Sequence, residues 1–217
     1  METFVLWILC AAAAGAFIAQ LAVRARLVAA APGTLTLDRL GLRLQRLIID
    51  VIGQRRTIRE RPVAGIAHAL VFWGFLAFGG YTALEFLDGL GLLHLTREPW
   101  FTRYRLGLTP VAVLVLGGIL ILLARRVLVR PGELGSTVSR ESVVIGLFIA
   151  ILMSTFLLAW HFEPGSVAGR VNWWAHAAVV LAFLVLIPAS KHLHLLLSPL
   201  AVFLKSPELG TVPNLDF

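Results

Sequence analysis

Long apolar runs separated by short polar segments dominate the sequence. Five of these runs are close to the roughly 20 residues that a helix needs to cross a membrane. They lie at about 4–23, 63–87, 107–124, 143–160 and 173–197, and nearly all of the charged residues fall between them. The pattern predicts an all-α fold, a polytopic membrane bundle of five transmembrane helices within residues 1–205, followed by a tail at 206–217.

The polar segment after the first run has a helical pattern of its own. One apolar row and one mostly basic row recur at helical spacing: Leu40, Leu44, Leu47 and Val51, and Arg39, Arg43, Arg46 and Asp50. Thr36 and Asp38 precede them as possible caps. We expect an amphipathic helix on the inner membrane surface, with its arginines at anionic headgroups and its leucines in the acyl boundary. A docking surface for a soluble partner is the alternative, and both interpretations can hold.

The composition excludes an ordinary soluble domain. Hydrophobic residues make up 59% of the chain and charged residues 14%, and the mean hydropathy is +0.87. The single cysteine, Cys10, can form neither an internal disulfide nor a cysteine cluster for zinc or iron–sulfur. The first run follows only Met-Glu-Thr, so we expect a retained helix rather than a cleaved signal peptide.

The Lys and Arg residues divide unequally between the two sides of the membrane. Fifteen lie in 24–62, in 125–140 or at the end of the fifth run and beyond, and four lie on the other side: Arg97, Arg103, Arg105 and Arg170. Loops rich in Lys and Arg stay in the cytoplasm. We therefore expect a multi-pass protein of the inner (cytoplasmic) membrane, with its N-terminus outside and its C-terminus in the cytoplasm. The net charge of +7 reflects this topology and no nucleic-acid partner.

Histidines within the spans carry the candidate chemistry, because ionisable side chains are costly in hydrocarbon and so indicate function. His68 enters the second helix from the cytoplasmic side, and His194 lies near the cytoplasmic end of the fifth. Two neutral imidazoles at matching depth can supply both axial ligands of a b-type haem between helices. The plain alternative for any one of these histidines is a hydrogen bond to a neighbouring helix.

A second site is expected nearer the outer surface. On a regular helix His176 shares a face with His194, about 27 Å away. His161, at the outer end of the fourth helix, is the candidate partner for His176, for an outer haem or a quinol-facing site. An interfacial histidine beside Trp160 and Trp174 is an equally good interpretation of His161.

The other two histidines are expected to have ordinary roles. His192 points about 160° away from His194 on a regular helix and is interpreted as a snorkelling residue. His94 is interpreted as a loop residue.

Two segments resemble a known family: QRRTIRERPVAGIAHALVFWGFLAF (54–78) and WWAHAAVVLAFLVLIPASKHLHLLLSPLAVFL (173–204). They are similar to the membrane domain of heterodisulfide-reductase-related (Fe–S)-binding oxidoreductases, which in turn resembles the gamma subunit of respiratory nitrate reductase. The family's histidines correspond to His68, before Phe-Trp-Gly-Phe, to His176, after paired tryptophans, and to His194, before Ser-Pro-Leu.

The resemblance implies a cytochrome b-like module that binds haem b and exchanges electrons with the quinone pool. It implies a cytoplasmic iron–sulfur or flavoprotein partner, because family members often continue into a domain with ferredoxin-type Cys motifs. Residues 206–217 lack such a motif, so the cluster belongs to a separate subunit or to a domain beyond this chain. The nitrate reductase gamma chain has two histidines on its second helix, whereas this sequence has only His68 there, which leaves a second haem open.

We therefore expect a haem iron held by His68 and His194, with His176 and His161 at a second site. Quinol oxidation releases protons, and His161, Glu163 and Glu85 are candidates to receive them. Two other functions remain open: a transporter that uses its histidines for protons or metal ions, and a non-redox anchor for a cytoplasmic complex.

Overall fold

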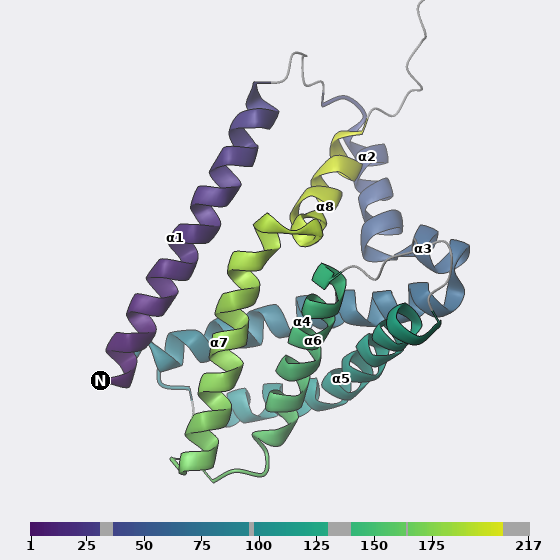
Figure 1. Ribbon diagram of the computed structural model, residues 1–217. Helices are drawn as coiled ribbons and strands as arrows, with labels where there is room; N and C mark the ends of the chain where they lie inside the picture. Colours follow the sequence, from purple (N-terminus) through teal and green to yellow (C-terminus); the bar gives the residue numbers. More distant parts are fainter. Residues whose placement is uncertain (31–36, 96–97, 130–139, 164, 206–217) are drawn as a thin grey trace, which may run out of the picture.

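The computed structural model describes residues 1–30, 37–95, 98–129, 140–163 and 165–205 (Figure 1). Within these residues five helices are long and apolar enough to cross a membrane: α1 (Glu2–Ala29), α4 (Pro62–Gly89), α5 (Pro99–Ala124), α6 (Arg140–Leu158) and α7 (Val167–Ala189). The predicted all-α class and the five membrane helices are confirmed. The predicted tail at 206–217 and the possible cap Thr36 lie outside the described residues.

Shorter helical elements lie at the ends of these spans. They are α2 (Leu40–Arg46), the π-helix η1 (Leu47–Ile52) and α3 (Arg55–Glu60) before α4, the π-helix η2 (Arg125–Val129) after α5, and the 3₁₀ turn η4 (Lys191–Leu193) with α8 (His194–Leu204) after α7. The region predicted as one amphipathic helix is thus helical but changes from α to π geometry at Leu47.

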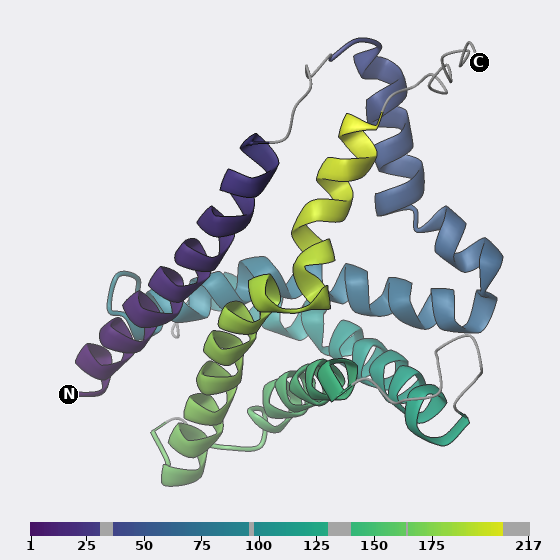
Figure 2. The same ribbon diagram turned by 45° about the horizontal axis from the view of Figure 1, so that its top comes forward.

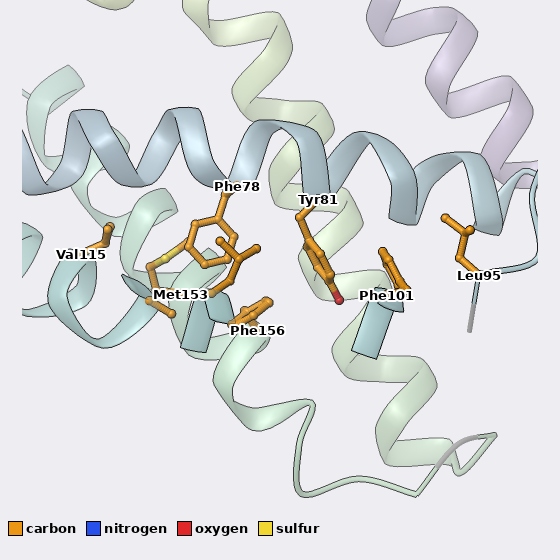
Figure 3. Close-up of a cluster of buried hydrophobic side chains, with 9 residues drawn as sticks. Phe78, Tyr81, Leu95, Phe101, Val115, Met153 and Phe156 are labelled. Carbon is orange, nitrogen blue, oxygen red and sulfur yellow. The ribbon is translucent and has the colours of Figure 1, made fainter. Parts of the chain in front are cut away.

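The spans pack mainly against their neighbours in sequence. Helix α4 packs on α5, α5 on α6 and α6 on α7, while α1 lies along α7. In both views α7 runs across α4 rather than alongside it (Figures 1 and 2). An aromatic core joins α4, α5 and α6 (Figure 3). The ring of Tyr81 stacks on that of Phe101, with ring centres 5.0 Å apart, and lies edge-on to that of Phe156, with ring centres 5.5 Å apart. Such ring pairs add attraction beyond the burial of their area.

Contacts at the two ends agree with the predicted alternation of the spans. At one end the Trp7 indole donates to the carbonyl of Leu90 at 3.2 Å, and Arg170 lies 3.9 Å from Glu2. The N-terminus, the end of α4 and the start of α7 therefore meet. At the opposite end α2 contacts α8. Which end faces the cytoplasm stays a prediction from the charge distribution.

The fifth span is shorter than predicted, because α7 ends at Ala189 and not near 197. Pro188 has no N–H to donate, and Ser190 is extended, with φ −122° and ψ 179°. The Ser190 hydroxyl accepts from the backbone N–H of His192 at 3.1 Å and so begins a new turn. Helix α8 is therefore a separate element with its own direction.

The third span begins at Pro99, earlier than the predicted 107. Its first turns include Arg103 and Arg105, which the hydropathy pattern assigned to the preceding loop. The guanidinium of Arg105 lies 4.0 Å from the ring centre of Trp160, two residues after the end of α6. A cation over an indole face is attracted by the ring quadrupole, which explains how a basic residue is held there.

The predicted outward orientation of Arg43 is wrong. Its side chain is only 1% exposed and donates to the backbone oxygens of Phe203 (2.9 Å) and Lys205 (3.2 Å) at the end of α8, a contact that we call the Arg43 latch. The last carbonyls of a helix lack donors of their own. Asp38 is not the cap of α2 either: Arg39 precedes the helix at φ 50°, and the Asp38 carboxylate accepts from Arg43 at 2.8 Å. That contact lowers the pKa of Asp38.

The orientation can be tested with cysteines placed at predicted opposite sides, in a Cys10→Ala background. We expect a membrane-impermeant maleimide to label His94→Cys in intact spheroplasts and Arg56→Cys only after lysis. Both residues are exposed, and they lie beyond opposite ends of the span α4. The reverse labelling pattern would show that the charge-based orientation is inverted.

Gly65 permits α3 to fold back on the start of α4. A Cβ at this position would overlap backbone atoms of Thr57 and Ile58, which cannot rotate away. We expect Gly65→Ala to lower the free energy of unfolding by about 1–3 kcal/mol, measured as a lower thermal midpoint in detergent. Gly107→Ala, where a Cβ meets open space, is the control and should be neutral or slightly stabilising. Equal midpoints for the two variants would contradict the close contact.

Candidate functional site

A cavity of about 520 Å³ lies among α4, α5, α6, α7 and α8. We call it the histidine cavity, because four of the six histidines line it: His68, His176, His192 and His194. Most of the remaining lining is apolar and includes Phe72, Phe75, Phe78, Val115, Ile145 and Phe183. A large apolar cavity with a few convergent polar groups is the usual form of a ligand or cofactor site.

The predicted pair His68 and His194 comes together across this cavity, with ring centres 6.5 Å apart and ring planes inclined by 33°. Metal–imidazole nitrogen bonds are about 2.0–2.1 Å long, as at zinc, and the ring centre lies roughly 1.2 Å behind the nitrogen. Two imidazoles on opposite sides of one metal ion therefore have centres about 6.4 Å apart. The observed spacing suits a pair of axial ligands.

The ring of His68 is held by Gln54, which precedes α3. The Gln54 amide nitrogen donates to the carbonyl of Val51 at 2.7 Å, so its oxygen faces His68 Nδ1 at 3.2 Å. An amide oxygen only accepts, and Nδ1 must therefore be the donor. The arrangement leaves Nε2 of His68 unprotonated and available to a metal ion. Sequence reasoning missed Gln54, although it opens the first family-like segment.

The ring of His194 is held in the same way by a backbone carbonyl. Its Nδ1 lies 2.9 Å from the oxygen of Lys191, which also only accepts. Nε2 of His194 is thus unprotonated as well. Both candidate ligands therefore suit coordination through Nε2, and both have the supporting hydrogen bond that usually orients a metal-bound histidine.

His192 is closer to the site than predicted. Its ring centre lies 5.7 Å from that of His194, and both side chains line the histidine cavity. The prediction that His192 points away assumed a regular α-helix, whereas His192 lies in the 3₁₀ turn Lys191–Leu193 and His194 begins α8 after it. The break at Ser190 also removes the argument that His176 and His194 share one helix face.

His176 lies in the wall between the histidine cavity and a second cavity. Its Nδ1 is 2.7 Å from the Thr155 hydroxyl, whose proton is directed to the carbonyls of Ile151 (2.8 Å) and Leu152 (3.0 Å). With its proton on one of these carbonyls, the Thr155 hydroxyl oxygen can accept from Nδ1 of His176. The structure does not bring His161 to His176: His161 is exposed and lines neither cavity.

Two guanidinium nitrogens are buried without a hydrogen-bond partner among the described residues. Nε of Arg126 belongs to a residue that lines the histidine cavity, and Nη2 of Arg105 to one that lines the second cavity. A buried donor without an acceptor costs free energy. Each arginine thus has unused capacity to bind an anionic or oxygen-bearing ligand.

The second cavity, of about 480 Å³, has a more polar lining and is called here the Glu85 cavity. Its polar residues include Tyr81, Glu85, Asp88, Arg105, Thr155, Glu163, Arg170, Asn172 and His176. The Tyr81 hydroxyl donates to the Glu85 carboxylate at 2.9 Å. Of the three predicted proton acceptors, Glu85 and Glu163 line this cavity and His161 does not.

Comparison with known proteins identifies relatives that are oxidoreductases or subunits of oxidoreductases. The chain is 26% identical over 204 residues to a probable iron–sulfur-binding oxidoreductase, FadF, of Bacillus subtilis, with 81% of this chain and 29% of that protein covered. It is 23% identical over 199 residues to the EtfAB:quinone oxidoreductase of Syntrophomonas wolfei, with 75% and 28% covered. The chain therefore spans less than a third of either relative.

The chain covers more of a third relative, one of the subunits of the dihydromethanophenazine:CoB–CoM heterodisulfide reductase of Methanosarcina thermophila. The identity is 28% over 178 residues, with 73% of this chain and 65% of that relative covered. No protein-family profile and no solved structure matches, and the similarity to the nitrate reductase gamma chain stays a prediction. These homologues confirm the family resemblance predicted from residues 54–78 and 173–204, since they are a heterodisulfide reductase subunit, an iron–sulfur-binding oxidoreductase and an EtfAB:quinone oxidoreductase.

Proposed function

We propose that this membrane electron-transfer protein binds haem b between His68 and His194 and passes electrons between a lipid-soluble quinone-type carrier and a soluble redox partner. The observation that carries the proposal is the pair of imidazoles whose ring centres lie 6.5 Å apart, each with a hydrogen-bond acceptor at Nδ1 that leaves Nε2 for iron. A b-type haem with two histidine ligands supplies one-electron redox chemistry.

The chain's own residues would bind, orient and shield this group. Gln54 and the Lys191 carbonyl keep the two imidazoles oriented and increase their basicity. The apolar walls, with Phe72 and Phe75 among them, exclude water and so influence the redox potential. Arg126, whose buried Nε has no partner among the described residues, would bind a propionate carboxylate.

The names of the relatives support both electron partners. One is an EtfAB:quinone oxidoreductase, one an iron–sulfur-binding oxidoreductase, and one uses dihydromethanophenazine. The partner of this chain is accordingly an iron–sulfur protein or flavoprotein. It would dock at the end that carries α3, where Arg55, Arg56 and Arg59 are exposed and favour an acidic surface.

An absorption spectrum of the purified protein, made with adequate haem supply, tests the cofactor. We expect a Soret band and, after reduction with dithionite, the α and β bands of a b-type cytochrome. His68→Ala and His194→Ala should each reduce haem content at least about tenfold, because each removes one of two axial ligands. His161→Ala is the control and should retain the spectrum, since His161 lines neither cavity. Haem content that stays equal in all three variants would refute the assignment of the ligands.

The role of Gln54 can be separated from ligation itself. Gln54→Leu removes the acceptor from His68 Nδ1 and should weaken haem affinity about 10–100-fold. Gln54→Glu keeps an acceptor and should retain haem but lower the reduction potential, because a carboxylate makes the imidazole more basic. Haem titration and potentiometry measure the two effects. A Leu variant with normal affinity and potential would leave Gln54 without this role.

A further inference from the structure

We propose that the Glu85 cavity binds the headgroup of the quinone-type carrier, with Glu85 as its proton acceptor and Arg105 as the donor to its second oxygen. This inference rests on the proposed electron-transfer function and says where its substrate, the quinone-type carrier, binds. It also assigns the Glu85 cavity to this substrate in place of a second haem.

Glu85 is the first element of this site. It lies within the membrane span α4, where an ionisable side chain is costly and indicates function. Its carboxylate accepts a hydrogen bond from the hydroxyl of Tyr81, which is only 2% exposed and is fixed by stacking on Phe101. One carboxylate oxygen is thus held in place, and the second can receive a proton from a ligand.

Arg105 provides the opposite polarity from another helix. Its guanidinium is fixed over the ring of Trp160 at 4.0 Å, and its Nη2 is buried with no hydrogen-bond partner in the described part of the chain. A quinol hydroxyl gives its proton to an acceptor, and a quinone oxygen accepts a hydrogen bond from a donor, so a site that serves both oxidation states needs one group of each kind. Glu85 on α4 and Arg105 on α5 line the same cavity and meet both needs.

The remaining walls suit a flat ring and differ from a haem site. Trp173 and Trp174 line the cavity and offer aromatic faces for stacking. Among the described residues that line it, His176 is the one histidine, whereas a bis-histidine haem needs two. The mixture of carboxylate, guanidinium, amide and hydroxyl groups favours a polar headgroup over a porphyrin.

His176 connects this cavity to the electron acceptor. It lines both cavities, and its ring is fixed by Thr155, whose carbonyl in turn accepts from the Asn172 amide at 2.9 Å. A headgroup in the Glu85 cavity is therefore separated from the histidine cavity by this imidazole. The short path favours electron transfer between the two cavities.

The reaction balances with the groups named. Oxidation of one quinol to a quinone breaks two O–H bonds and releases two electrons and two protons. One proton passes to the Glu85 carboxylate and the other to water at the cavity mouth. The two electrons would leave one at a time to the one-electron group proposed for the histidine cavity, and the iron–sulfur protein or flavoprotein partner would reoxidise that group between the two transfers. Reduction of a quinone is the same sequence in reverse.

The rate test uses menadiol as the probe and the haem-loaded protein. We expect Glu85→Gln to slow haem reduction by menadiol about 100-fold, the usual size of a lost general base, with an unchanged spectrum and unchanged reduction by dithionite. Glu98→Gln is the matched control, because Glu98 is exposed and lines neither cavity. If Glu85→Gln does not accumulate, Tyr81→Phe tests the same hydrogen bond and should slow the reaction. A rate equal to that of the control would overturn the role of Glu85.

The binding test does not depend on haem. Menadione should quench the fluorescence of the tryptophans around the cavity, and Arg105→Gln should weaken this binding about tenfold, while Arg103→Gln, an exposed neighbour outside the cavity, should not. Equal affinities would overturn the assignment of the cavity. If the protein binds menadione as expected but no haem, the cavity assignment stands and the proposed function fails, so the two failures are distinguishable.

Discussion

The structure depends on one constraint: a polar group inside a membrane span needs a partner within the protein, because hydrocarbon offers none. His68 and His176, which lie in α4 and α7, each have Nδ1 within hydrogen-bond distance of a side-chain oxygen, and His194, which begins α8, has its Nδ1 beside the carbonyl of Lys191. Satisfying one nitrogen of an imidazole also determines which nitrogen is left for a ligand. The hydrogen bond that satisfies one ring nitrogen thus also leaves the other nitrogen for a ligand. The residues that accept this bond, such as Gln54, therefore matter as much as the imidazole rings.

The two cavities divide the chemistry by polarity. The histidine cavity is mostly apolar and favours a large, flat, mainly apolar group such as the proposed haem. The Glu85 cavity has groups that donate, accept and carry charge, which favours a ligand that exchanges protons. His176 belongs to both. With these two cavities, the electrons and the protons of the proposed quinol substrate would take different routes.

The sequence was sufficient for the five spans, since length and hydropathy decide which helices cross a membrane, and matched depth paired His68 with His194. It was insufficient for the break at Ser190, because a proline near the end of an apolar run can kink a membrane helix or end it. The inward position of Arg43 depends on carbonyls about 160 residues later in the chain. Gln54 likewise acts across 14 positions, through a left-handed backbone between two helices. Such partners are set by tertiary packing, which local patterns do not report.

The Arg43 latch gives the two candidate ligands a common support. Arg43 in α2 holds the last carbonyls of α8, the helix that His194 begins, and Gln54, just after η1, holds the ring of His68. One short segment, outside the five spans, therefore bears on both imidazoles. A displacement of that segment would reach His68 through Gln54 and His194 through the end of α8. A protein that binds α2 and η1 would therefore be able to alter the spacing of the two imidazoles without entering the cavity between them.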